Sequence, residues 1–164
     1  ATTPSNVLDR TKKVLDAYVL SQISEDTNAD LQNQFPESSY LTQQQLNGKK
    51  LFFGKARCAG CHAGSTFTDN QFHNNGFFTD QQLAKGLNGA RLVKTPSLRN
   101  LGQTAPYMHD GSISSIRDVV DIYNDGGRRN ANGDLVSDRI HHDILPLELT
   151  EQEKNQLVRY LESL

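Results

Sequence analysis

Two cysteines and a histidine form the group of residues whose spacing most directly suggests chemistry. Cys58-Ala59-Gly60-Cys61-His62 matches the Cys-x-x-Cys-His pattern of c-type haem attachment. Two thiols three residues apart on one turn can add to the two vinyl groups along one edge of a porphyrin. The adjacent His62 can then bind the iron through a neutral imidazole. Because Cys58 and Cys61 are the only cysteines, none is left for a disulfide, and the pattern predicts one covalent haem c.

Two other kinds of site also use a Cys-x-x-Cys pair. A redox dithiol of the thioredoxin type belongs at the start of a helix that follows a strand. Here a predicted helix precedes the cysteines, and no convincing strand pair is visible in the sequence. A zinc site needs two further ligands, and no other histidine stands at a recognised spacing from Cys61. Those histidines are His73, His109, His141 and His142.

The elements that must position the motif are predicted to be helices. Apolar residues at helical spacing predict an amphipathic helix over 5–23, and the polar stretch 24–40, which contains Pro36, predicts a loop or irregular arm. Thr42 with Gln45 forms a capping box. It opens a helix that runs to Phe53 and leads the chain into Cys58.

Two more helices are predicted towards the C-terminus. Ser115 caps a helix whose apolar positions from Ile116 to Tyr123 recur at i, i+3, i+4 and i+7, and Thr150 with Glu153 opens a helix over 151–163. Residues 63–111 show little periodicity, which is unusual inside one domain unless the segment wraps something or carries function. Residues 128–143 are predicted to form a surface loop with a turn at 132–133.

Length and composition limit the classes of function. The 164 residues fit one domain, with 1–41 as an N-terminal helix and arm and 42–164 as the main domain. The net charge of −2 gives no basic surplus for nucleic acid. No segment approaches the roughly 20 apolar residues of a membrane span, and the N-terminus lacks the features of a signal peptide. Hydrophobic residues make up only 35% of the chain, so the apo-protein is predicted to fold poorly without the apolar surface of a haem.

Several segments in order along the chain resemble the bacterial di-haem cytochrome c peroxidases and their MauG-like relatives. They are GKKLFF at 48–53, FTDN at 67–70, HN at 73–74, KTPSLRN at 94–100, TAPYMHDGS at 104–112, VVDIYN at 119–124 and LELTEQEK at 147–154. Together they cover about residues 42–164. The predicted fold class is therefore all-α: a class I cytochrome c-like helical domain wrapped around one covalent haem, with long irregular loops.

The resemblance is to one half of that family. Members usually carry an N-terminal haem domain, where peroxide reacts, and a C-terminal haem domain that stores or relays an electron; this chain resembles the second. It has no second Cys-x-x-Cys-His motif, and it has no tryptophan, whereas in well-studied members a tryptophan lies between the haems. Peroxidase activity therefore does not carry over directly.

Two residues are candidates for the sixth position on the iron. Met108, the only methionine, would suit an electron-transfer cytochrome, because a thioether favours ferrous iron. In the di-haem peroxidases the methionine ligand follows the histidine of the Pro-Tyr-x-His motif by 14 residues, and counting from His109 that position is Tyr123. MauG-like proteins use a tyrosine there. The resemblance thus ranks Tyr123 first, Met108 second, and a histidine or an open position last.

The haem motif and the family resemblance together also predict a function. The leading interpretation is a mono-haem c-type cytochrome that transfers electrons to a redox protein partner, which could be a second haem domain or subunit. The alternatives are peroxide reduction, alone or with a partner haem subunit, and a haem-based sensor. The resemblance implies a periplasmic or secreted location. It also implies a candidate calcium site at the backbone oxygens of Thr104 and Pro106, completed in the family by an Asn from the other half.

Overall fold

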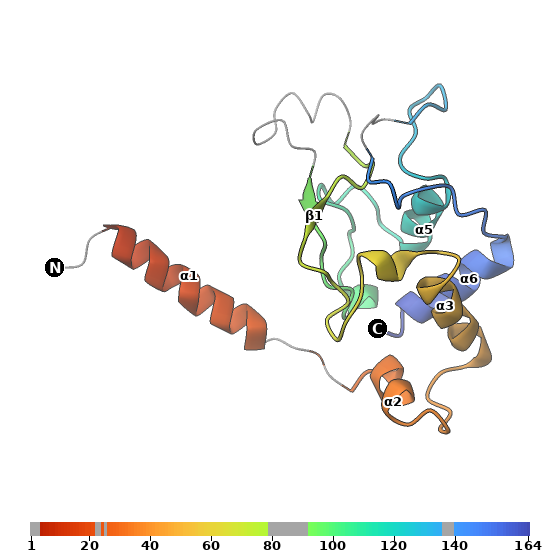
Figure 1. The fold of residues 1–164 in the computed structure, drawn as a ribbon, viewed down its shortest axis with the longest axis horizontal. Coiled ribbons are helices and arrows are strands. Elements are labelled where there is room, and N and C mark those ends of the chain that lie inside the picture. Colours follow the sequence, from red (N-terminus) through yellow and green to blue (C-terminus); the bar gives the residue numbers. More distant parts are fainter. Residues whose placement is uncertain (1–3, 22–23, 25, 79–91, 136–139) are drawn as a thin grey trace.

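The computed structural model describes residues 4–21, 24, 26–78, 92–135 and 140–164. Within these ranges the chain forms five α-helices, two short 3-10 turns and one pair of two-residue strands, so the predicted mostly helical fold is confirmed. The elements, shown in Figure 1, are α1 (Pro4–Ser21), α2 (Asn28–Gln34), α3 (Gln43–Phe53), η1 (Cys58–Gly60), β1 (Phe72–His73), β2 (Val93–Lys94), η3 (Leu101–Gln103), α5 (Ile116–Asn124) and α6 (Glu151–Leu161).

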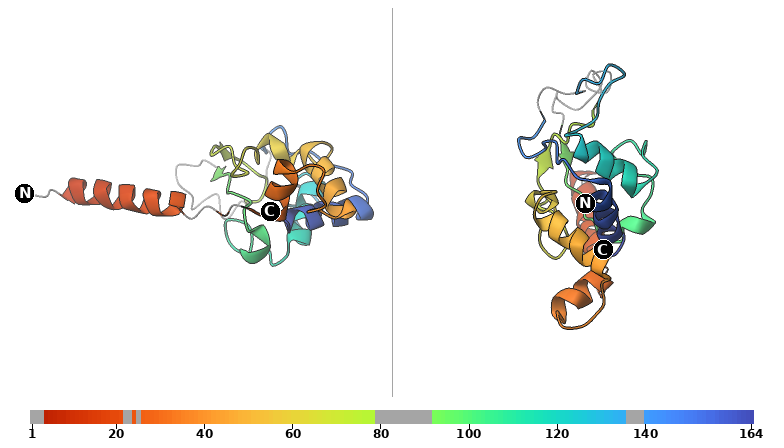
Figure 2. Two further views of the ribbon diagram at one scale, coloured as in Figure 1. Left: turned by 90° about the horizontal axis from the view of Figure 1, so that it is seen from below. Right: turned by 90° about the vertical axis from the view of Figure 1, so that its right-hand side faces the viewer.

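The first helix, α1, agrees with the range predicted from the sequence and stands apart from the other helices. Both Figure 1 and the left view of Figure 2 show it projecting away from them. Its apolar side chains, among them Leu8, Val14 and Val19, are exposed. Among the described residues, no helix is both long enough and apolar enough to cross a membrane.

The polar arm after α1 is not wholly irregular, which corrects the prediction for 24–40. Residues Asn28–Gln34 form α2, which begins at a capping box between Thr27 and Asp30. Gln32 is buried, and its side-chain amide donates to the carbonyl of Pro36 at 2.9 Å. A seven-residue helix has too few turns to give a visible apolar period, so the cap was its main signal in the sequence.

Arg99 lies in the loop that follows β2, and its side chain binds α2. Its two terminal nitrogens donate to the two carboxylate oxygens of Asp30 at 2.7 and 2.9 Å, and its Nε donates to the Ser65 carbonyl at 2.7 Å. The guanidinium also lies over the Phe67 ring, 5.6 Å from its centre. The Arg99 side chain is only 11% exposed. Its hydrogen bonds hold the pKa of Asp30 below the usual value, as expected for a bidentate pair.

We expect Arg99→Ala to lower the free energy of unfolding by about 2–4 kcal/mol, because it leaves a partly buried carboxylate without its partner. The free energy of unfolding of Arg99→Lys should lie between those of the wild type and Arg99→Ala, since lysine keeps the charge but loses the bidentate geometry. Denaturant unfolding at neutral pH checks this, with exposed Arg10→Ala on α1 as the control.

The same pair predicts a pH dependence. Because the folded-state pKa of Asp30 lies below its unfolded value of 3.8, the stabilisation is fully present above that value and is lost as the pH falls through the folded-state pKa. Wild type and Arg99→Ala should therefore converge in stability in acid. A difference between them that stays constant down to the acid limit of folding would contradict this account.

Helices α3 and α6 lie against each other (Figures 1 and 2), and both contribute buried side chains to the core. Both begin at the capping boxes predicted from the sequence. Gly48 allows the close approach, because a Cβ atom there would lie 2.0 Å from the backbone oxygen of Gln156. Phe52, Leu157 and Tyr160 fill the contact and are fully buried.

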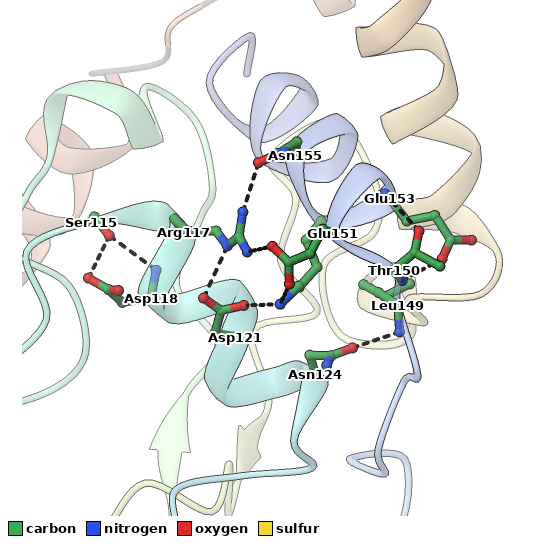
Figure 3. Close-up of polar contacts among 11 residues, drawn as sticks. Ser115, Arg117, Asp118, Asp121, Asn124, Leu149, Thr150, Glu151, Glu153 and Asn155 are labelled. Atoms are coloured by element: carbon green, nitrogen blue, oxygen red, sulfur yellow. Dashed lines mark hydrogen bonds and ion pairs between the residues drawn. The ribbon is translucent and has the colours of Figure 1, made fainter.

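Charged side chains hold α5 against α6 (Figure 3). Arg117 on α5 donates to Asp121 at 3.0 Å and to Asn155 on α6 at 2.7 Å, and it also pairs with Glu151. Lys154 on α6 donates to Asp121 at 2.7 Å. Figure 3 shows these side chains bridging the two helices.

A short strand pair, β1 with β2, follows the cysteine motif and was not visible in the sequence. The two strands are antiparallel, with His73 opposite Val93. Two residues are too few to show the alternating pattern of a strand. Beside the pair, the Thr68 hydroxyl donates to the Thr95 carbonyl at 2.7 Å, so the segment after the motif is tied to the segment after β2.

The two predicted loops are described only in part. The loops predicted over 63–111 and 128–143 include residues 79–91 and 136–139, which lie outside the described ranges. The predicted turn is confirmed at Gly133, whose φ is 86° and whose N–H donates to the Asn130 carbonyl.

Candidate haem site

The cysteine motif forms a tight turn directly after α3. Arg57 adopts a left-handed conformation, the 3-10 turn η1 follows, and the His62 N–H donates to the Cys58 carbonyl at 2.9 Å. Both thiols are free. Burial raises the pKa of Cys58 to about 12 and also raises the pKa of Cys61. The turn therefore presents two protonated thiols and one imidazole from a single short segment.

The tautomer of His62 follows from its hydrogen bond. Its Nδ1 lies 2.9 Å from the Phe67 carbonyl oxygen, and because a carbonyl can only accept, Nδ1 must carry the proton. Burial lowers the pKa of His62, and the bond to Phe67 opposes that effect. The imidazole is thus kept neutral with Nε2 unprotonated, which is the form that binds a metal.

Two adjoining cavities, of about 390 and 120 Å³, lie beside the motif. Cys58 and His62 line both of them, and Cys61 lines the smaller one. The walls of the larger cavity are mostly apolar and come from α3, α5, α6 and the loops between them, including Phe52, Leu98, Leu101, Ile116, Val120, Leu157 and Leu161. Two thiols, one metal-binding imidazole and a broad apolar surface fit a haem c, because the porphyrin is flat and apolar and its iron takes axial ligands.

Tyr123 and Met108, the two candidate axial ligands, both reach this region. Tyr123 lies on α5 and lines both cavities together with His62, whereas Met108 lines only the larger one. Burial raises the pKa of Tyr123 to about 12. Met108 lies in a loop and has a φ of 70°. Tyr123 is thus carried by a helix and Met108 by a loop, and which of them ligates the iron stays a prediction.

Asn75 was not singled out from the sequence, although it lines both cavities. The Asn75 side chain opposes the effect of burial on the pKa of Tyr123. Its Oδ1 accepts the N–H of Phe77 at 3.2 Å. The sequence signal was slight: an Asn before Gly76, typical of a turn, directly after the family-like pair at 73–74.

The remaining histidines have different surroundings. His109 lines the larger cavity and its ring contacts that of Phe78, with centres 4.2 Å apart. His73 is hydrogen-bonded to Asp69 at 2.7 Å, and its ring meets that of His141 edge to face. The expectation that the pair at 141–142 is solvated holds for His142, which is 83% exposed, but not for His141, which is largely covered.

The candidate calcium residues belong to the lining of the larger cavity. Thr104 and Pro106 both line it, and both are exposed. A calcium ion held by their backbone oxygens stays a prediction.

The part of the chain that holds this site is similar in sequence to known proteins. Residues 45–164 match the sequence family described as Cytochrome c. The methylamine utilization protein MauG of Methylorubrum extorquens is 38% identical over 135 residues, an alignment that covers 78% of this chain and 36% of that protein. A cytochrome-c peroxidase of Denitromonas iodatirespirans is 32% identical over 162 residues, covering 78% of this chain and 41% of the relative.

Solved structures are also similar over most of the chain, and one of them is closely related in description to the first relative. It is described as a MauG-like protein associated with microbial copper homeostasis, and it superposes with a TM-score of 0.71 at 30% identity, covering 85% of this chain and 48% of that one. The chain thus spans less than half the length of the relatives it matches.

Proposed function

The chain belongs to the cytochrome c family and is the C-terminal haem domain of the group that contains MauG and the di-haem cytochrome c peroxidases. We propose that it is a mono-haem electron-transfer domain. When bound, haem c supplies a one-electron couple at its iron. The polypeptide holds it through Cys58 and Cys61 as thioether anchors and through His62 as proximal ligand. We place Tyr123 in the distal position, with Met108 as the alternative.

One observation carries this proposal: His62 and Tyr123 line the same two cavities, together with Cys58. If both residues ligate the iron, the protein fills both axial positions. No position is then left for a substrate, which suits a carrier better than a catalyst. The neutral imidazole of His62, with its proton held at Nδ1 by the Phe67 carbonyl, supports its part in this arrangement.

A partner is needed for electron transfer, and we propose a second haem domain or subunit. The relatives are more than twice as long as the segment they share with this chain, which leaves room in each of them for another domain. We also place the protein in the periplasm, because covalent haem attachment in bacteria takes place outside the cytoplasmic membrane.

A second candidate function is peroxide reduction, because one of the relatives is a cytochrome-c peroxidase. The two functions differ in a direct experiment on the isolated holo-protein. We expect the dithionite-reduced form to pass electrons to an oxidised small c-type cytochrome. With hydrogen peroxide and excess reductant we expect no turnover above that of free haem, because both axial ligands come from the chain. Saturable turnover of many peroxide molecules per chain would instead establish the enzyme.

A further inference from the structure

We propose that His141, His142 and Asp143 form a binding site for one divalent transition-metal ion of the kind that prefers imidazole ligands, such as Zn²⁺. One imidazole nitrogen from each histidine and one carboxylate oxygen of Asp143 lie within 4.8 Å of one another. None of these three residues is a proposed haem ligand, so the inference goes beyond the proposed function.

The distances between the three side chains suit a shared ion. Asp143 Oδ2 lies 3.7 Å from His141 Nδ1, and Asp143 Oδ1 lies 3.5 Å from His142 Nε2. Both distances are longer than an ordinary hydrogen bond. A zinc ion with bonds of about 2.0–2.2 Å to nitrogen and oxygen holds neighbouring tetrahedral ligands about 3.4 Å apart. Small side-chain rotations would therefore place all three ligand atoms on one ion.

A tight turn brings these consecutive side chains together. The Ile144 N–H donates to the His141 carbonyl at 2.9 Å, so His142 and Asp143 are the central residues of the turn. In an extended strand, consecutive side chains would point to opposite faces. The His141 N–H also donates to the Asn74 carbonyl at 2.9 Å, which ties the turn to the segment after β1.

His141 is the most firmly held of the three ligands. Its side chain is only 23% exposed, and its ring meets that of His73 edge to face, with centres 4.6 Å apart. The His141 Nδ1 accepts the Asp143 N–H in a long hydrogen bond of 3.4 Å. This nitrogen is therefore unprotonated and has the lone pair that a metal ion needs. A bound ion would replace only that weak contact.

His142 and Asp143 leave the site open to solvent. Their side chains are 83% and 51% exposed, so an ion can reach them and both can rotate towards it. Three protein ligands leave the fourth tetrahedral position for a water molecule. Two neutral imidazoles with one carboxylate suit Zn²⁺, Cu²⁺ or Ni²⁺, whereas Mg²⁺ and Ca²⁺ prefer oxygen ligands alone.

A second group of possible ligands lies nearby. Ligand atoms of Cys61, Asp69 and His73 are also within 4.8 Å of one another. In the proposed function the Cys61 sulfur is bound to haem, and His73 is hydrogen-bonded to Asp69 at 2.7 Å. The group at 141–143 is therefore the better candidate, and the experiment below separates the two.

Calorimetric titration of the chelator-treated holo-protein with Zn²⁺ tests the site. We expect one Zn²⁺ per chain. The affinity should fall about tenfold or more in each of His141→Gln, His142→Gln and Asp143→Asn, because even the loss of a residue that only supports a metal ligand costs that much. An excess of Mg²⁺ should not displace the Zn²⁺. His142→Gln alters a highly exposed side chain, so its effect is not one of folding.

Two further variants make the test specific. Asp134→Asn is the matched control, because Asp134 is also an exposed carboxylate but lies outside the group, and it should keep the wild-type affinity. His73→Gln should keep the ion as well. Zn²⁺ binding that the three ligand variants retain, or that is lost in His73→Gln but kept in His142→Gln, would overturn the proposal. So would a wild type that binds no more Zn²⁺ than the triple ligand variant.

Discussion

Replacing both Cys58 and Cys61 by serine is expected to abolish covalent haem attachment and to leave most of the chain unfolded. The larger cavity measures about 390 Å³. Without haem, the apolar side chains that line this cavity would face water, and because an ordinary domain is only marginally stable, the loss of that burial is expected to unfold it. The residues that line the cavity, such as Phe52 and Leu157, are also the centre of the core.

Haem staining of a denaturing gel and the far-ultraviolet circular dichroism of the purified variant check this prediction. The single variants Cys58→Ser and Cys61→Ser serve as controls, because each keeps one thiol for one thioether bond and should stay coloured and folded. A double variant that keeps its haem colour after denaturation would contradict the role of the thiols. An apo-protein with a wild-type thermal transition would contradict the role of haem in the core.

Substitutions of Tyr123 are expected to change the reduction potential and the absorption spectrum of the haem strongly. Tyr123→Met replaces an oxygen ligand with a thioether, which favours ferrous iron, so the reduction potential should rise. Since axial ligands set haem potentials over a range of about 0.8 V, the rise should be on the order of 0.1 V or more. Tyr123→Phe, which offers no ligand atom, should change the ferric absorption spectrum as well.

Two controls make this test specific. Met108→Leu conserves volume and should leave both the spectrum and the potential close to wild type. Tyr18→Phe removes a hydroxyl from an exposed tyrosine on α1 and should have no effect. If Tyr123→Phe keeps the wild-type spectrum while Met108→Leu changes it strongly, Met108 is the ligand and the assignment is reversed.

The parts of the fold that sequence reasoning predicted well are those with local signals. The capping boxes at Thr42 and Thr150 marked the starts of α3 and α6, and the apolar period from Ile116 to Tyr123 marked α5. Each of these signals lies within one or two helical turns and depends only on neighbouring residues. The Cys-x-x-Cys-His motif is equally local, so the cavity beside it could be anticipated before its walls were known.

The features that were missed depend on distant contacts or on very short elements. The strand pair β1 and β2 joins two-residue segments 20 or so positions apart, and no periodicity can be read from two residues. The ion pair between Arg99 and Asp30 joins residues that are 69 positions apart in the sequence. Asn75 and Tyr123 line the same two cavities only because the turn at Gly76 and the helix α5 come together there. Nothing local in the sequence specifies such meetings.

The proposed function depends on one haem bound covalently through Cys58 and Cys61. The most direct test is the intact mass of the purified holo-protein under denaturing conditions, with the double serine variant measured beside it. We expect the mass of the polypeptide plus one haem for the wild type and that of the polypeptide alone for the variant. A wild-type mass equal to that of the bare polypeptide, or to that of the polypeptide plus two haems, would contradict it.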